Sequence, residues 1–241
     1  MRLLSLFAIA PLVGLSSLYG SDWIAASAAE LSEKGAKVEP NADAEVLFWE
    51  VRVHHETNRL ADVPLPTPLM PTMGGGGDFS LGIPAITTQT DQYIRLKIFN
   101  DRGRDRFTTL RIPDPWYVVI SDIAARWTQP NGTIISLDKH SIVEEKGTHG
   151  RGPKAFALPG VVSGSIVEYR WRETREYNPA YREFSCQRDV PVRLMRYFFK
   201  PSNDRVRLIG PPDHFQGPPL VKEPHGFASA TVENIPGRTR W

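Results

Sequence analysis

Cys186 is the one cysteine among the 241 residues and the side chain best suited to act as a nucleophile. A cysteine hydrolase needs a thiolate beside a base, commonly histidine, that a third group orients. The histidines that could serve are His140, His149, His214 and His225. No local signature links any of them to Cys186. A small buried hydrophobic residue is the simpler interpretation, and a thiol hydrolase using Cys186 is kept as an alternative.

Two short stretches carry residue types that bind metals: His54, His55 and Glu56, and Asn41, Asp43 and Glu45. The first stretch lacks the spacing of an HExxH site or a zinc finger. The second alternates like calcium ligands but lacks the glycine and the distal glutamate of an EF-hand loop. A lone cysteine also excludes a multi-cysteine site, so we assign no metal-ligating residue.

A run of four glycines at residues 74–77 follows four prolines within "ADVPLPTPLMPTMGGGGDFSLGIPAITTQTD" (residues 61–91). A phosphate-binding loop requires a helix directly after the glycines, and here β-like sequence follows. The segment is interpreted as a surface loop, and no cofactor-binding residue is assigned.

Arginines and aromatic residues supply the candidate contact surface. The net charge is only +2, which argues against a nucleic-acid partner, although the segment 151–207 is locally basic. Arginines that alternate along strands are expected to form the solvent face. We assign a partner- or glycan-contact surface to four residues: Trp116, Tyr117, Arg170 and Arg172.

The elements that would position these residues begin after a leader. "MRLLSLFAIAPLVGLSSLYG" has one positive charge and then an apolar run, which predicts a signal peptide over residues 1–20, with cleavage as late as residue 28 as the alternative. Residues 21–40 are a lead-in segment, expected to be a short helix or extended. No later run is long and apolar enough to cross a bilayer, so no membrane contact is expected after cleavage.

The remaining sequence alternates with the period of two that is typical of strands. In "EVLFWEVRVHH" the residues Leu47, Trp49, Val51 and Val53 fall on one face. "YIRLKIFNDRGRDRFTTLRI" predicts a strand pair joined by a turn at residues 100–103. Asn131 and Gly132 predict a hairpin.

"FALPGVVSGSIVEYRW" predicts a turn at Pro159 and Gly160, a bend at Gly164, and then a strand. The fold class is therefore all-β: an antiparallel β-sandwich of two packed sheets, with long loops and little helix, over residues 41–237. Its core is expected around Trp49, Leu96 and Trp171.

Six blocks between about residue 40 and residue 237 carry a family resemblance. They are "PNADAEVLFWEVRV", "YIRLKIFNDRGRDRF", "ISDIAARWTQPNGTIISLD", "KAFALPGVVSGSIVEYRWRE", "FSCQRDVPVRLMRYFFKP" and "ATVENIPG". Together they resemble a domain of unknown function (domain of unknown function 3857) that precedes a transglutaminase-like core in exported bacterial proteins. The resemblance implies a β-sandwich and export to the periplasm or cell envelope of a bacterium.

The resemblance also implies that the catalytic residues lie in a separate domain. In relatives they lie beyond the segment similar to "ENIPG", so none is carried over to this chain, and residues 238–241 are expected to be a truncated linker. The expected function is a non-catalytic accessory module that docks against, orients or presents substrate to a transglutaminase-like catalytic domain or another envelope protein. An envelope module that binds polysaccharide is the alternative, together with the thiol hydrolase.

Overall fold

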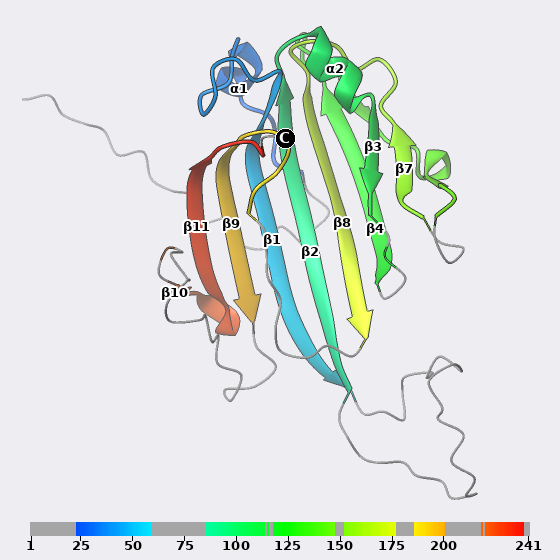
Figure 1. Ribbon diagram of the computed structural model, residues 1–241, viewed down its shortest axis with the longest axis vertical. Helices are drawn as coiled ribbons and strands as arrows, with labels where there is room; N and C mark the ends of the chain where they lie inside the picture. The colour runs from blue at the N-terminus through cyan, green and yellow to red at the C-terminus, as the bar shows by residue number, and fades with distance from the viewer. Residues whose placement is uncertain are drawn as a thin grey trace, which may run out of the picture.

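The computed structural model describes residues 23–58, 85–113, 115, 118–147, 152–176, 186–200, 218 and 220–238. Its main element is a large sheet of eight strands (Figure 1). In spatial order these are β10 (Val221–Lys222), β11 (Ala228–Ile235), β9 (Val192–Lys200), β1 (Ala44–Asn58), β2 (Ala85–Ile98), β8 (Ile166–Glu176), β4 (Val119–Thr128) and β5 (Ile134–Ser136).

A small sheet of three strands forms the second layer, in the order β3 (Thr109–Ile112), β7 (Lys154–Ala157) and β6 (Val143–Glu144). Helices within the described residues are short: α1 (Ala28–Ser32), α2 (Asp101–Phe107) and the 3-10 turns η3 (Lys139–Ser141) and η5 (Pro224–Gly226). None of these helices is long and apolar enough to span a bilayer. The predicted all-β class is confirmed.

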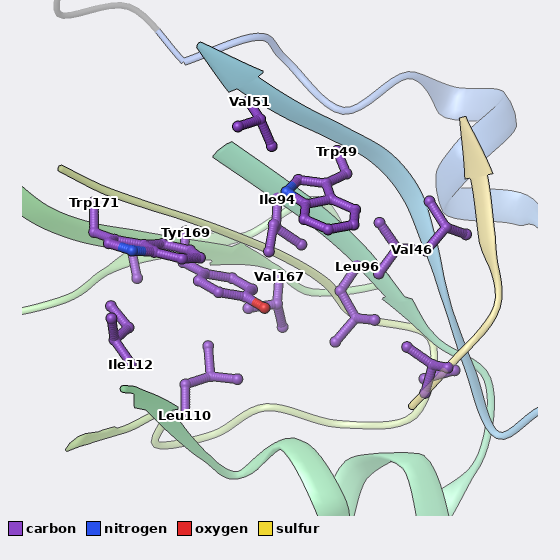
Figure 2. Packing of buried hydrophobic residues seen from close by; sticks show 14 of the residues in the cluster. Val46, Trp49, Val51, Ile94, Leu96, Leu110, Ile112, Val167, Tyr169 and Trp171 are labelled. Atoms are coloured by element: carbon purple, nitrogen blue, oxygen red, sulfur yellow. The ribbon is translucent and has the colours of Figure 1, made fainter. Parts of the chain in front are cut away.

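The two sheets enclose one core (Figure 2). Leu110, Ile112 and Phe156 of the small sheet belong to the same buried cluster as residues of β1, β2 and β8. Trp49 is 3% exposed, Leu96 1% and Trp171 6%, so the three residues expected at the centre are buried there. Sheet-on-sheet packing of alternating apolar side chains thus organises the fold.

One strand pairing differs from the expected wholly antiparallel sandwich. β1 and β9 run parallel, with Val46 beside Val192 and Val53 beside Phe199. The Pro191 carbonyl accepts a hydrogen bond from the Val46 amide at 2.9 Å, so β9 begins beside the start of β1. Two strands that enter the sheet at the same end must run in the same direction.

A β-bulge corrects the predicted inward face of β1. The register with β2 shifts between Val46 and Phe48, so two residues of β1 oppose one residue of its partner. Val46 rather than Leu47 joins Trp49 in the core cluster. A strict period of two continued through the bulge therefore assigned Leu47 to the wrong face.

The predicted strand pair around residues 100–103 is also wrong. Asn100 caps α2, its side-chain oxygen accepting from the Gly103 amide at 3.0 Å. After this helix the chain leaves the large sheet, because β3 pairs with β7 and not with β2. The loop expected at residues 61–91 is shorter than predicted, since residues 85–91 lie in β2 between β1 and β8. Its proline and glycine part lies outside the described residues.

The turns predicted at residues 131–132, 159–160 and 164 are confirmed. Gly132 has a φ of 85°, and the Asn131 side chain accepts from the Thr133 amide at 2.9 Å between β4 and β5. Gly160 and Gly164 have φ values of 74° and 87°, which glycine adopts at little cost, and β8 follows them directly.

Candidate functional site

The face of the large sheet opposite the core carries a set of charged side chains, here called the charged face: Glu45, Arg95, Lys97, Arg126, Glu168 and Arg193. Ile94 and Leu96 of β2 point into the core. Successive side chains of a strand point to opposite faces of the sheet, so Arg95 and Lys97 point away from the core. Glu45, Lys97 and Glu168 are 0% exposed, contrary to the expected solvent face. Residues 23–38, here called the lead-in strap, lie against this face and include α1 at the upper end of the sheet in Figure 1.

Glu168 on β8 is the centre of the charged face. Its Oε1 accepts from the Tyr93 hydroxyl and from Arg95 Nη2 at 2.9 Å, and its Oε2 accepts from Arg126 Nε at 2.6 Å. Burial and the Glu168 charge raise the pKa of Tyr93, so the phenol stays protonated and donates. These bonds join β2, β8 and β4 through one carboxylate.

The two arginines around Glu168 also hold the lead-in strap. The Ile24 carbonyl accepts from Arg95 Nη2 at 2.5 Å and from Arg126 Nη2 at 2.6 Å. Arg95 Nη1 pairs with Glu30 at 3.0 Å. A main-chain oxygen and a carboxylate of the strap therefore accept hydrogen bonds from the buried guanidinium of Arg95, and the same main-chain oxygen accepts from the half-buried Arg126.

Lys97 binds the strap through carbonyl groups. Its Nζ donates to the Leu31 carbonyl at 2.9 Å and to the Gly164 carbonyl at 2.6 Å. Burial lowers the pKa of Lys97, and Glu33 and Glu30 act against that shift. The ammonium thus fixes the strap to the bend that precedes β8.

Glu45 anchors the end of the strap. Its carboxylate accepts from the Lys37 and Val38 amides at 3.0 and 2.8 Å. Arg193 of β9 contacts Glu45 and also donates to Glu33 at 2.7 Å. Glu45 thus stabilises main chain and pairs with an arginine, which leaves no role for it as a calcium ligand.

The charged face holds a chain segment. Both Glu168 oxygens accept from cationic donors. Arg95, Arg126 and Lys97 donate hydrogen bonds to carbonyl oxygens, so what they bind is main chain. In this structure that main chain is the lead-in strap.

Two of the four tentative contact residues are described, and both have partners within the protein. The Arg170 guanidinium lies 4.7 Å from the ring centroid of Trp23 in the strap. Arg172 pairs with Asp91 at 2.7 Å and with Asp122 at 3.1 Å. Burial raises the pKa of Asp91 against the influence of Arg172. Trp116 and Tyr117 lie outside the described residues, so their grouping with the arginines as a contact surface stays a prediction.

Cys186 is half-buried and packs against the core cluster. Burial raises the pKa of its thiol, whereas a nucleophilic cysteine needs a lowered one. Of the candidate bases, His149 and His214 lie outside the described residues, and neither His140 nor His225 hydrogen-bonds to Cys186. These features favour the interpretation of Cys186 as a small hydrophobic residue.

The two stretches of metal-binding residue types have other partners. His55 lies 2.8 Å through Nδ1 from the Thr88 hydroxyl. Asp43 accepts from Asn100 at 2.7 Å and from Arg102 at 3.1 Å. Across the described ranges, no group of three His, Cys, Asp or Glu side chains is arranged to hold a metal ion.

A polar cluster on the core side of the large sheet was missed from the sequence. Glu173 Oε1 accepts from Gln92 at 2.7 Å and from Trp171 Nε1 at 3.2 Å, and Gln92 accepts from Trp49 Nε1 at 3.3 Å. Arg175 donates to the other Glu173 oxygen at 2.9 Å. The sequence did carry a signal for this cluster, because the alternation along each strand places Gln92 and Glu173 at positions whose side chains face the core.

Two solved structures are similar to this chain, and the first of them, with a TM-score above 0.5, shares its fold. The chain is similar to a "putative protease" from Parabacteroides distasonis, with a TM-score of 0.55 and 14% identity over 83% of this chain. It is also similar to a "putative nutrient binding protein" from Legionella pneumophila, with a TM-score of 0.38 and 7% identity over 82% of this chain. The chain spans 37% of the first protein and 65% of the second.

No curated protein matches the chain. Residues 87–223, more than half of the sequence and most of the large sheet, match the Domain of Unknown Function DUF3857. The matched region includes Arg95, Lys97, Arg126, Glu168 and Arg193 of the charged face, together with both glycine turns before β8. The chain therefore belongs to the DUF3857 family.

Proposed function

We propose that this chain is a non-catalytic accessory module that docks against a separate catalytic domain and orients it or presents substrate to it. The observation that carries the proposal is the charged face. Its buried acids and bases are bonded to one another and to the lead-in strap, so they stabilise the module and are not available to a substrate.

The companion in this proposal is a transglutaminase-like domain or another envelope protein. Its support is the resemblance to the domain that precedes such cores, and the fold shared with a protein of which this chain spans only 37%. The leader at residues 1–20 supports export to the periplasm or envelope of a bacterium.

The genomic DNA beyond the Trp241 codon tests the proposal first. A reading frame that continues into a Cys-His-Asp core is expected. That core would then be expressed with and without residues 23–238, and its unfolding temperature and kcat/KM measured. We expect both to fall without the module, whereas equal values for the two chains would contradict docking.

The thiol-hydrolase alternative is tested on the purified chain. Hydrolysis of a fluorogenic peptide and an activated ester is measured for the wild type and for Cys186→Ala. We expect no hydrolysis above buffer from either protein. Turnover by the wild type that Cys186→Ala abolishes would instead assign the activity to this chain.

A further inference from the structure

Arg188, in the loop before β9, differs from the arginines of the charged face because no carboxylate of the described residues forms an ion pair or hydrogen bond with it. Its guanidinium lies over the Trp49 ring, 3.9 Å from the centroid. Its Nε is buried and donates to no acceptor within the described residues. More than nine-tenths of buried polar groups in folded proteins have a partner, so this atom requires an explanation.

The two carboxylates that interact electrostatically with Arg188 are bonded to other cations. Glu173 and Asp189 both interact electrostatically with Arg188, but Glu173 pairs with Arg175 at 2.9 Å and Asp189 with Arg106 at 3.4 Å. Burial lowers the pKa of Arg188, and these acids act against that shift. Arg188 is thus a partly desolvated cation on an aromatic surface.

We propose that Arg188, held over Trp49, binds a carboxylate that a protein partner supplies, either an acidic side chain or a C-terminus. A planar guanidinium matches the two oxygens of a carboxylate, and contact with the indole restricts its orientation. Glu173 and Asp189 favour a singly charged ligand, because a doubly charged phosphate meets about twice the repulsion.

The proposal rests on the docking function for the source of the carboxylate, but the site is tested without any partner domain. Chemical shifts of the Arg188 Nε–H and the Trp49 indole N–H are followed by NMR. The titrants are Ac-Gly-Glu-Gly-NH2, Ac-Gly-Gln-Gly-NH2, Ac-Gly-Gly-Gly-OH and inorganic phosphate. Saturation by the glutamyl or free-acid peptide is expected, with Kd in the millimolar range, about that of a single charge-assisted pair. The two acids distinguish a side chain from a C-terminus as the source.

Variants identify the group responsible. Arg188→Gln is expected to weaken the acid peptide at least about tenfold, and Arg188→Lys, which keeps the charge without the planar fork, by a smaller factor. Arg170→Gln is the matched control, since Arg170 also lies over a tryptophan, and it should bind as the wild type does.

Three outcomes would overturn the proposal. These are the failure of both acid peptides to bind more tightly than the glutaminyl peptide, phosphate binding tighter than both acid peptides, and unchanged binding by Arg188→Gln or, should that variant not fold, by Arg188→Lys. Failure of the docking experiments with these peptides still bound would count against the proposed function and not against the site.

Discussion

Glu168 shows how much a single residue can matter on the charged face. Glu168→Gln keeps the shape of the side chain but leaves the buried Arg95 and the half-buried Arg126 without their shared counter-ion. Breaking a buried ion pair from one side costs about 3–5 kcal/mol, so we expect a loss of that order in the free energy of unfolding, measured with urea.

Glu145→Gln is the control for that experiment, because Glu145 pairs with the exposed Arg111 and should cost less than about 1 kcal/mol. Equal effects of the two substitutions would show that the charged face is solvated and that the buried pairing is wrong.

Gly103 marks a close contact between backbones. A Cβ at this position would lie 2.3 Å from the Asp43 carbonyl oxygen, which itself accepts from the Phe99 amide at 2.9 Å. Gly103→Ala must therefore shift α2 away from the start of β1, and we expect it to destabilise the protein by about 1–3 kcal/mol in urea unfolding.

Gly35→Ala is the matched comparison for Gly103→Ala. Nothing lies within 4 Å of a Cβ at Gly35, and its φ is not in the left-handed region. This substitution should be neutral or stabilise slightly, because alanine lowers the entropy of the unfolded chain. Similar losses at the two positions would argue against a specific clash at Gly103.

Among the elements, the lead-in strap decides whether the buried charges are satisfied. Chains that begin at residue 21 and at residue 29 correspond to the two cleavage positions predicted from the sequence. The shorter chain lacks the Ile24 carbonyl, the Trp23 ring and the Ser27 cap of α1. We expect it to unfold at a markedly lower urea concentration. Its free energy of unfolding should fall by at least the cost of two buried hydrogen-bond donors left without a partner, about 2–6 kcal/mol.

N-terminal sequencing of the protein from its native cells provides the second measurement on the strap. A mature chain that begins at residue 21 agrees with the structure. If both truncated chains unfold at the same midpoint, the strap contributes nothing to stability and its contacts with Arg95 and Arg126 are incidental.

Elements of the fold could be predicted from the sequence wherever a local rule sufficed. Alternation placed Val167, Tyr169 and Trp171 in the core, and turn residues located the hairpin at Gly132. Local rules could not locate the bulge after Val46, since a bulge depends on the partner strand. Nor could they distinguish α2 from a turn, because its seven residues satisfy both patterns.

The site was harder to predict because burial is a tertiary property. Arg95 and Lys97 alternate with apolar residues just as solvent-facing side chains do. Only the return of residues 23–38 onto that face makes them buried, and the strap has no apolar pattern that would signal it. The parallel pairing of β1 with β9 is likewise a long-range contact that sequence spacing does not encode.

On the scale of the whole molecule, a group of carboxyl side chains and His55 should determine how stability depends on pH. Despite burial, bonds to Ser27 and Arg95 lower the pKa of Glu30, and bonds to Arg193 and Lys37 lower that of Glu33. Their contribution is present above the ordinary value of 4.5 and is lost as the pH falls below it. Asp91 acts in the opposite sense, because burial raises its pKa above the ordinary value of 3.8 and its unfavourable contribution is relieved as the pH falls through that raised pKa.

Above that acid range His55 should determine how stability changes with pH. Burial and the neighbouring His54 lower the pKa of His55 below its ordinary value of 6.5, and its ring also meets the edge of Phe199, with centroids 5.2 Å apart. The unfolded chain therefore binds a proton before the folded chain does, so the stabilising contribution is complete above pH 6.5 and is lost as the pH falls through the folded pKa. We expect the urea midpoint to fall between about pH 7.5 and pH 5, with a smaller fall for His55→Gln. His140→Gln, at an exposed position, should retain the wild-type slope, and a His55→Gln slope equal to it would show that His55 is not the titrating group.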